Sequence, residues 1–243
     1  ENGYVEAIQT LNGWSNEGCT EPTLTLLRDM YAFGTYMTLT GTLTLEGGTH
    51  TAKNVTVAEN ADVTFASGSY RGATIDGTAT VKEGVTFIDD ATVTVNGTLN
   101  AKGGTFDGPV EFNGSSTANI SGGSFNCEKI YGGVEFGYNV TGTISGGMFA
   151  FADFYTTKVK LSGGTFKEIK SYGDRKLADL LAEGAAYYNG DSAVSNDNVS
   201  SLNNVTVKSH EHNGGTDGNG TCSICGKKMA ASLTVGGKTS WYT

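Results

Sequence analysis

The residues best suited to chemistry lie near the end of the chain, in a segment holding two of its three histidines and two of its four cysteines. His210-Glu211-His212 is followed, after nine intervening residues, by Cys222-Ser223-Ile224-Cys225-Gly226. A Cys-x-x-Cys sequence before glycine forms a tight knuckle that directs two sulfurs at one point, and two imidazoles complete a tetrahedral zinc site. Because the glycine-rich stretch between them has no side chains for a core, the sequence predicts a structural zinc ion bound by His210, His212, Cys222 and Cys225.

The same cysteines allow two other interpretations. A disulfide between Cys222 and Cys225, or a pair of free thiols, competes with zinc, whereas a redox pair needs a βαβ context that the surrounding sequence lacks. If zinc is bound, protein groups fill all four positions, so the ion is expected to be structural rather than catalytic. Cys19 and Cys127 lie too far apart in the expected fold to form a disulfide.

A second candidate site is aromatic and lies in the middle of the chain. The expected binding residues are Tyr131, Phe136, Tyr138, Phe151, Phe154 and Tyr155. Aromatic patches in which tyrosine is prominent are typical of protein interfaces and of glycan-binding platforms. The alternative is that half of these rings fill the interior of the fold.

The carboxylates form only a weak catalytic constellation. An inverting glycosidase needs two carboxyl groups ~6.5–9.5 Å apart, and the nearest acidic pair, Asp89 and Asp90, would point to opposite faces of a strand. Arg71 and Asp107 fall on neighbouring repeats, where acidic residues at corners are usually solvated. We therefore expect no enzymatic activity.

One repeated phrase organises the elements that must position these residues. It reads Ser-Gly-Gly-Ser-Phe over 121–125, Ser-Gly-Gly-Met-Phe over 145–149 and Ser-Gly-Gly-Thr-Phe over 162–166. Degraded copies end at His50, Phe65, Phe87 and Phe106. The phrase thus returns after 15 to 24 residues, and a repeat of about 20 residues with variable gaps indicates a stacked array.

Short runs between the phrases alternate threonine or asparagine with valine, isoleucine or leucine, as in Thr92-Val93-Thr94-Val95. This period of two is typical of strands with one buried face, and glycines can turn the corners between them. The sequence therefore predicts an all-β fold, a right-handed parallel β-helix over residues 37–170. Phe65, Phe87, Phe106, Phe125, Phe149 and Phe166 are expected to stack in one buried column.

Both ends of such a solenoid need covers, because open ends expose apolar side chains and unpaired strand backbone. Residues 1–36 are expected to form an N-terminal cap, with a short helix over Tyr4–Leu11 that stops at Asn12-Gly13 and a strand over Thr23–Leu27. Residues 171–204 are expected to form a helical cap and linker. Residues 205–243 would hold the zinc-knuckle-like segment and a strand, a turn and a second strand that lead to a next module.

Details of the C-terminal cap follow from the same signals. Asp174 is the expected N-cap of its helix, and Gly184 the expected stop. Leu177, Leu180 and Leu181 would form its apolar stripe, and Tyr187 and Tyr188 would return to pack on the last coil. A loop is expected from Asn189 to Asn204, followed by a strand over Val205–Val207.

Composition limits the partners. The net charge of −9, with only 16 lysines and arginines, argues against nucleic acid or an anionic membrane surface. No apolar run approaches the ~18 residues of a membrane span. The chain lacks a signal peptide and a wall-anchoring tail, and is expected to be a mature fragment of a longer protein.

Three signatures in this order resemble the repetitive β-solenoid surface proteins of gut Firmicutes, over about residues 37–243. They are the Ser-Gly-Gly-Thr-Phe ladder, Leu180-Leu181-Ala182-Glu183-Gly184 with its following tyrosines, and the His-x-His and Cys-x-x-Cys-Gly segment. The resemblance implies a secreted or cell-wall-attached module of adhesin type, similar to immunoglobulin-binding surface proteins, and it transfers no particular binding residue. The expected partner is an extracellular host protein, of immunoglobulin or mucin type, or a glycan, bound by a monomeric unit of a tandem array. A structural spacer or a carbohydrate-binding or carbohydrate-degrading β-helix is the alternative.

Overall fold

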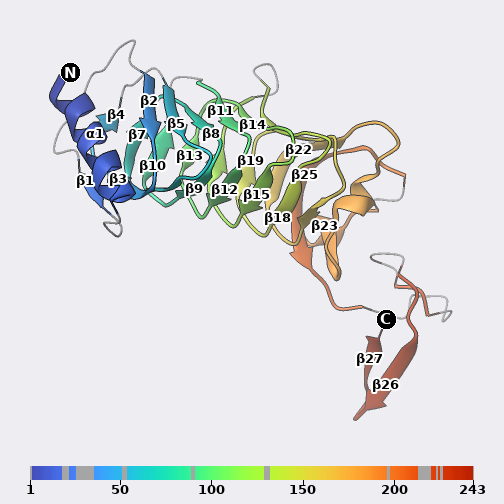
Figure 1. The fold of residues 1–243 in the computed structure, drawn as a ribbon. Coiled ribbons are helices and arrows are strands. Elements are labelled where there is room, and N and C mark those ends of the chain that lie inside the picture. The colour runs from blue at the N-terminus through green and yellow to red at the C-terminus, as the bar shows by residue number, and fades with distance from the viewer. Residues whose placement is uncertain are drawn as a thin grey trace.

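The computed structural model describes residues 2–17, 22–25, 36–50, 54–88, 91–128, 132–195, 198–212, 220–222, 224 and 227–242. These residues form a β-solenoid of about seven turns with one α-helix at its N-terminal end (Figure 1). The prediction of an all-β parallel β-helix is confirmed. Successive coils stack along one axis, so residues about 20 positions apart in the sequence become neighbours.

Each full coil contributes three short strands, and equivalent strands pair in parallel to form three ladders. The first ladder contains β1 (Thr23–Thr25), β3 (Thr42–Glu46), β6 (Asp62–Phe65), β9 (Thr78–Val81), β12 (Thr98–Ala101), β15 (Thr117–Ile120), β18 (Thr141–Ile144) and β21 (Val159–Leu161). The second contains β4 (Thr49–His50), β7 (Gly68–Tyr70), β10 (Val85–Phe87), β13 (Thr105–Phe106), β16 (Ser124–Phe125) and β19 (Met148–Phe149).

The third ladder contains β2 (Tyr36–Leu39), β5 (Asn54–Val57), β8 (Ala73–Ile75), β11 (Val93–Val95), β14 (Val110–Phe112), β17 (Val134–Phe136) and β20 (Ala152–Phe154). β22 (Thr165–Ser171) pairs with both β19 and β20, so it continues the second and third ladders at once. The period-two patterns explain these strands, since apolar side chains point inward and threonine, asparagine or glutamate points outward.

The repeated phrase builds a buried aromatic column in the second ladder. Phe87, Phe106, Phe125, Phe149 and Phe166 stack on one another with ring centroids 4.5–5.0 Å apart. Strand register continues this column upstream to Tyr70, whose partner position in β4 is His50. Offset stacking of buried rings adds stability beyond the burial of their area, by about 0.5–1.5 kcal/mol per pair.

Placing Phe65 in this column is wrong, although its burial is confirmed. Phe65 belongs to β6 of the first ladder, where it pairs in register with Leu45 and Val81. The degraded copy of the phrase is Ser67-Gly68-Ser69-Tyr70, and the ring of Tyr70 meets the ring of Phe65 edge-on at 4.9 Å. The corner between β6 and β7 is short, which brings both rings into the same layer of the core.

The two glycines of the phrase have separate steric reasons. A Cβ on Gly163 would lie 2.1 Å from the carbonyl oxygen of Ser145 in the preceding coil, so the first glycine permits close backbone approach. The second glycine, Gly164, has a φ of +105°, which residues with a side chain rarely adopt.

The N-terminal end is covered by α1 (Asn2–Asn16), which is longer than the predicted helix and runs through Gly13. Ile8 and Leu11 pack on the core, and this docking outweighs the cost of about 1 kcal/mol for glycine inside a helix. The Asn12 side chain donates to Thr38 O at 2.8 Å and accepts from Thr40 N at 3.0 Å. Asn12 thereby supplies hydrogen-bond partners for the first strand of the third ladder. β1 is itself a rung of the first ladder.

The C-terminal cap differs from the prediction. A 3₁₀ turn, η2 (Leu177–Leu180), replaces the expected α-helix, and its N-cap is Lys176 rather than Asp174. Leu177 and Leu180 are buried, while Leu181 bridges to Leu161 and extends the first ladder by one rung. The chain leaves the helical path because Leu181 completes that rung.

The segment expected to be a loop up to Asn204 is partly a strand. After β23 (Ala185–Asn189) and β24 (Ser192–Ala193), β25 (Ser201–Ser209) runs antiparallel to both β22 and β23. It starts four residues before the expected Val205, because the edge of β22 needs backbone partners over Thr165–Lys170. β26 (Ala231–Val235) and β27 (Lys238–Tyr242) form the expected pair of strands around a turn, and project away from the solenoid (Figure 1).

The phenylalanine column gives the first prediction. Replacing Phe125 by alanine opens a cavity between Phe106 and Phe149 and is expected to lower the free energy of unfolding by about 3–5 kcal/mol. Met148 is the matched control, since this large apolar side chain is 60 % exposed and its removal should change stability by less than about 0.5 kcal/mol. Urea unfolding followed by circular dichroism measures both, and equal effects would contradict the column as a source of stability.

Tyr187 gives a second prediction. Its buried hydroxyl donates to Leu177 O at 3.1 Å, so Tyr187→Phe should cost about 0.5–1.5 kcal/mol at neutral pH. Burial raises the pKa of Tyr187 above its ordinary 10.0. A raised pKa in the folded state gives stability that is fully present below pH 10 and lost as the pH rises above it.

The stability difference between wild type and Tyr187→Phe should therefore shrink above pH 10, because phenylalanine does not ionise. Unfolding midpoints measured on both sides of pH 10 test this, with Tyr188→Phe as the control in the next, partly exposed residue. A difference that stays constant through pH 11 would show that Tyr187 is not buried as a neutral phenol.

Candidate functional site

Three of the six predicted binding residues are core residues, and that part of the prediction is wrong. Phe136 and Phe154 stack with Phe112 in a second buried column, with centroids 4.5 and 5.0 Å apart, and none is more than 1 % exposed. Phe151 is 3 % exposed. Alternation explains the burial, because Val134 and Phe136 share the inner face of β17 while Glu135 points outward. Tyr131 lies outside the described residues.

The other two predicted residues lie on the surface and belong to a stack of three tyrosines. Tyr138 is 66 % exposed and its ring lies 5.5 Å from Tyr155, tilted by 52°. Tyr155 in turn stacks on Tyr172, with centroids 4.6 Å apart and rings inclined by only 6°. Tyr138 follows β17, Tyr155 follows β20 and Tyr172 follows β22, so the tyrosine stack climbs one corner of the solenoid.

Tyr172 and Arg175 complete this corner and were not predicted. The Arg175 guanidinium lies 5.4 Å from the centroid of the Tyr138 ring, and its Nη1 donates to Tyr172 O at 2.9 Å. Ser171 Oγ donates to Arg175 O at 2.9 Å, which holds the turn after β22 closed. The available sequence signal was spacing, because Tyr138, Tyr155 and Tyr172 are each 17 residues apart, close to one coil.

Charges on the outer face of the third ladder border the tyrosine stack. Glu111, Glu135, Asp153 and Lys170 occupy equivalent outward positions on four successive rungs. The Tyr172 hydroxyl donates a hydrogen bond to Asp153 Oδ2 at 3.1 Å, and Lys170 Nζ lies 4.6 Å from the Tyr172 ring centroid. The corner thus combines apolar rings, a cation beside each end of the stack and carboxylates along one side.

The Tyr155 hydroxyl remains protonated at physiological pH. Desolvation by neighbouring groups raises the pKa of Tyr155, and the negative charges of Glu135 and Asp153 raise it further. Tyr155 therefore presents a hydrogen-bond donor, not an anion, to any ligand at this corner.

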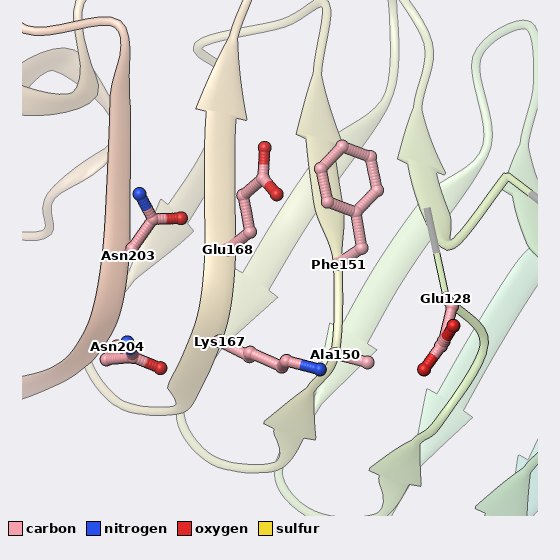
Figure 2. A pocket seen from close by; sticks show the side chains of 7 residues that line it. All are labelled: Glu128, Ala150, Phe151, Lys167, Glu168, Asn203 and Asn204. Carbon is pink, nitrogen blue, oxygen red and sulfur yellow. The ribbon is translucent and has the colours of Figure 1, made fainter. Parts of the chain in front are cut away.

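A hollow of about 330 Å³ lies at the other end of β20, at the corner between the second and third ladders (Figure 2). It is lined by Glu128, Ala150, Phe151, Lys167, Glu168, Asn203 and Asn204. Asn204 has a φ of +52°, which bends β25 around this corner. Phe151 and Tyr155 are the residues before and after β20, and the extended chain between them spans about 13 Å. The hollow and the tyrosine stack therefore lie at opposite ends of this strand.

Asp107 is one of the residues considered for catalysis that the structure describes. Asp107 Oδ1 accepts a hydrogen bond from Asn126 Nδ2 at 3.0 Å. This bond links two adjacent coils and explains an acidic residue at that corner. Asp89 and Asp90 lie outside the described residues.

Three of the four predicted metal ligands come together beyond the end of β25. The ligand atoms of His210, His212 and Cys222 all lie within 4.8 Å of one another, and His210 Nε2 is 3.6 Å from Cys222 Sγ. Cys222 is 1 % exposed. The fourth predicted ligand, Cys225, lies outside the described residues. Cys127 is buried, and its thiol donates to Glu128 O at 3.7 Å. Cys19 also falls outside the described residues.

Among the described residues, no helix has the length and apolar character needed to cross a membrane. In comparisons with known proteins, no family model, no curated relative and no solved structure matches this chain. The resemblance to repetitive surface proteins therefore remains an expectation from the sequence. The structure shows the fold, a β-solenoid.

Proposed function

We propose that this chain is a non-catalytic binding module of an extracellular bacterial surface protein. We further propose that it binds a host protein, of immunoglobulin or mucin type, through the tyrosine stack and Arg175. The single observation that carries the proposal is that Tyr138, Tyr155 and Tyr172 stack on the outside of a corner, whereas the two phenylalanine columns of the described residues are buried.

The chemistry of this corner matches that of protein-binding hot spots. Tyrosine and arginine are the residues most enriched there, and a ring with two side-chain torsions loses little conformational entropy on binding. Stacking and the contact between Arg175 and Tyr138 fix these side chains before a ligand arrives, which lowers the cost of association.

The orientation of the rings favours a protein over a glycan. A sugar packs against the open face of an aromatic ring, but Tyr155 and Tyr172 turn their faces toward each other at 4.6 Å. The ring edges and the Tyr155 hydroxyl face a partner, as suits hydrogen bonds to a polypeptide. The neighbouring, exposed Glu135 would favour a partner that brings arginine or lysine.

The upstream coils argue against a role as a spacer alone. Equivalent corners there carry polar side chains that bond to one another, as in Asn96 Nδ2 to Asp76 Oδ1 at 2.8 Å. A spacer would continue this pattern through every coil. The change from amide and carboxylate to tyrosine occurs only in the last coils and marks a local surface.

Removing the tyrosine stack should abolish binding without unfolding the protein. We expect Tyr138→Ala and Arg175→Ala each to weaken capture of immobilised immunoglobulin or mucin by at least about tenfold, and Tyr138→Ala with Tyr155→Ala to weaken it about a hundredfold or more. Surface plasmon resonance measures the affinities. The matched control is Tyr188→Ala, because Tyr188 also lies under a lysine, with Lys208 Nζ 4.6 Å from its centroid, but belongs to β23.

Three results would contradict the proposal. Undiminished binding by the Tyr138→Ala and Tyr155→Ala double variant would place the site elsewhere, and failure of the wild type to bind either ligand would exclude that ligand class. Loss of mucin binding after enzymatic removal of its glycans, with no immunoglobulin binding, would identify a glycan as the ligand. Unchanged unfolding midpoints in the variants show that any loss is local.

A further inference from the structure

The three described ligands lie where the chain leaves the solenoid, which gives them a structural setting. β25 ends at Ser209, and the next backbone group, His210 N, donates to Gly184 O at 2.9 Å. His210 is thereby anchored to the turn that precedes β23. The His210 and His212 rings are nearly perpendicular, at 85°, with centroids 5.0 Å apart, so their nitrogens can converge without the rings stacking.

Cys222 comes from a separate, tightly closed turn. Cys222 N donates to Lys227 O at 2.8 Å, and Met229 N donates to Gly220 O at 2.6 Å. Thr221 and Lys228 form an antiparallel bridge between these two bonds.

The distance between nitrogen and sulfur fits a shared metal ion. With zinc–nitrogen bonds of about 2.0–2.1 Å, zinc–sulfur bonds of about 2.3 Å and tetrahedral angles, the two ligand atoms should lie about 3.6 Å apart. The separation of His210 Nε2 and Cys222 Sγ is 3.6 Å. The third ligand atom, from His212, lies within 4.8 Å of both.

The burial of Cys222 outside the hydrophobic core of the solenoid also favours a bound metal ion. Cys222 is 1 % exposed, yet in β26 and β27 the side chains of Leu233 and Val235 are 55 % and 68 % exposed, so the hairpin adds little apolar cover. Thiolate and imidazole together select zinc over calcium or magnesium.

We propose that His210, His212 and Cys222 bind one zinc ion that ties residues 220–222 to the end of the solenoid. The ion pair between Lys227 and Glu183 also joins these two stretches of the chain. The zinc thus fixes the direction in which β26 and β27 leave the β-helix. This inference does not depend on the tyrosine stack or its ligand.

Metal analysis of the whole chain, purified under reducing conditions without added zinc, should give about one equivalent of zinc. Replacing zinc by cobalt(II) should give a thiolate-to-cobalt charge-transfer band and the strong visible absorption of a tetrahedral site. His210→Ala, His212→Ala and Cys222→Ser should each weaken zinc affinity by about a hundredfold or more. His50→Ala and Cys127→Ser are matched controls, since they remove the third histidine and a buried cysteine outside this cluster.

A structural readout separates a built site from adventitious binding. Chelation should open the chain to proteolysis between His212 and Thr221 while the unfolding midpoint of the solenoid changes little. The inference is overturned if the protein contains no zinc and takes up none, if a Cys222–Cys225 disulfide is found under these conditions, or if the ligand variants bind zinc as the controls do. Chelation that leaves the proteolysis pattern unchanged would also overturn the structural role.

Discussion

Hydrogen bonding between successive coils is the constraint on which the rest of the structure depends. Every strand of the three ladders obtains its backbone partners from the coils on either side, in strict parallel register. Stacking therefore places chemically equivalent residues on top of one another, inside as phenylalanine columns and outside as the tyrosine stack. Side-chain amides reinforce the same alignment, as in Asn119 Nδ2 to Asn100 Oδ1 at 3.0 Å. The two ends, which lack a further coil, receive substitutes from Asn12 and from β25.

The solenoid could be predicted because its signals are local and repeated. Alternating side chains identify the strands, and the glycine-glycine-x-phenylalanine phrase identifies one corner of each coil. Register was harder, since Phe65 and Tyr70 are only five residues apart and either could end a copy of the phrase. The pairing of β6 with β3 and β9 assigns Phe65 to the first ladder. The helix boundaries predicted at Gly13 and Asp174 were also wrong. Docking of α1 on the core overrides the stop signal at Gly13, and the pairing of Leu181 with Leu161 replaces the helix expected after Asp174.

The aromatic site was predicted only in part, because inner and outer columns look alike when rings are counted without regard to alternation. Val134-Glu135-Phe136 repeats the pattern of Val110-Glu111-Phe112, with the charged residue outward, and this marks Phe136 as interior. Tyr138, Tyr155 and Tyr172 have no such inward partner and recur at the coil length. The histidine and cysteine cluster needed no knowledge of the fold, since ligand type and spacing alone carry that signal.

The axial direction of the inter-coil hydrogen bonds has a mechanical consequence. α1 and the β26–β27 hairpin lie at opposite ends of the solenoid (Figure 1), so a tensile load applied through them acts along the stacking axis. Each rung is then pulled open one bond at a time, whereas strands loaded in shear must break all of their bonds together. The chain should extend stepwise at low force, one coil after another.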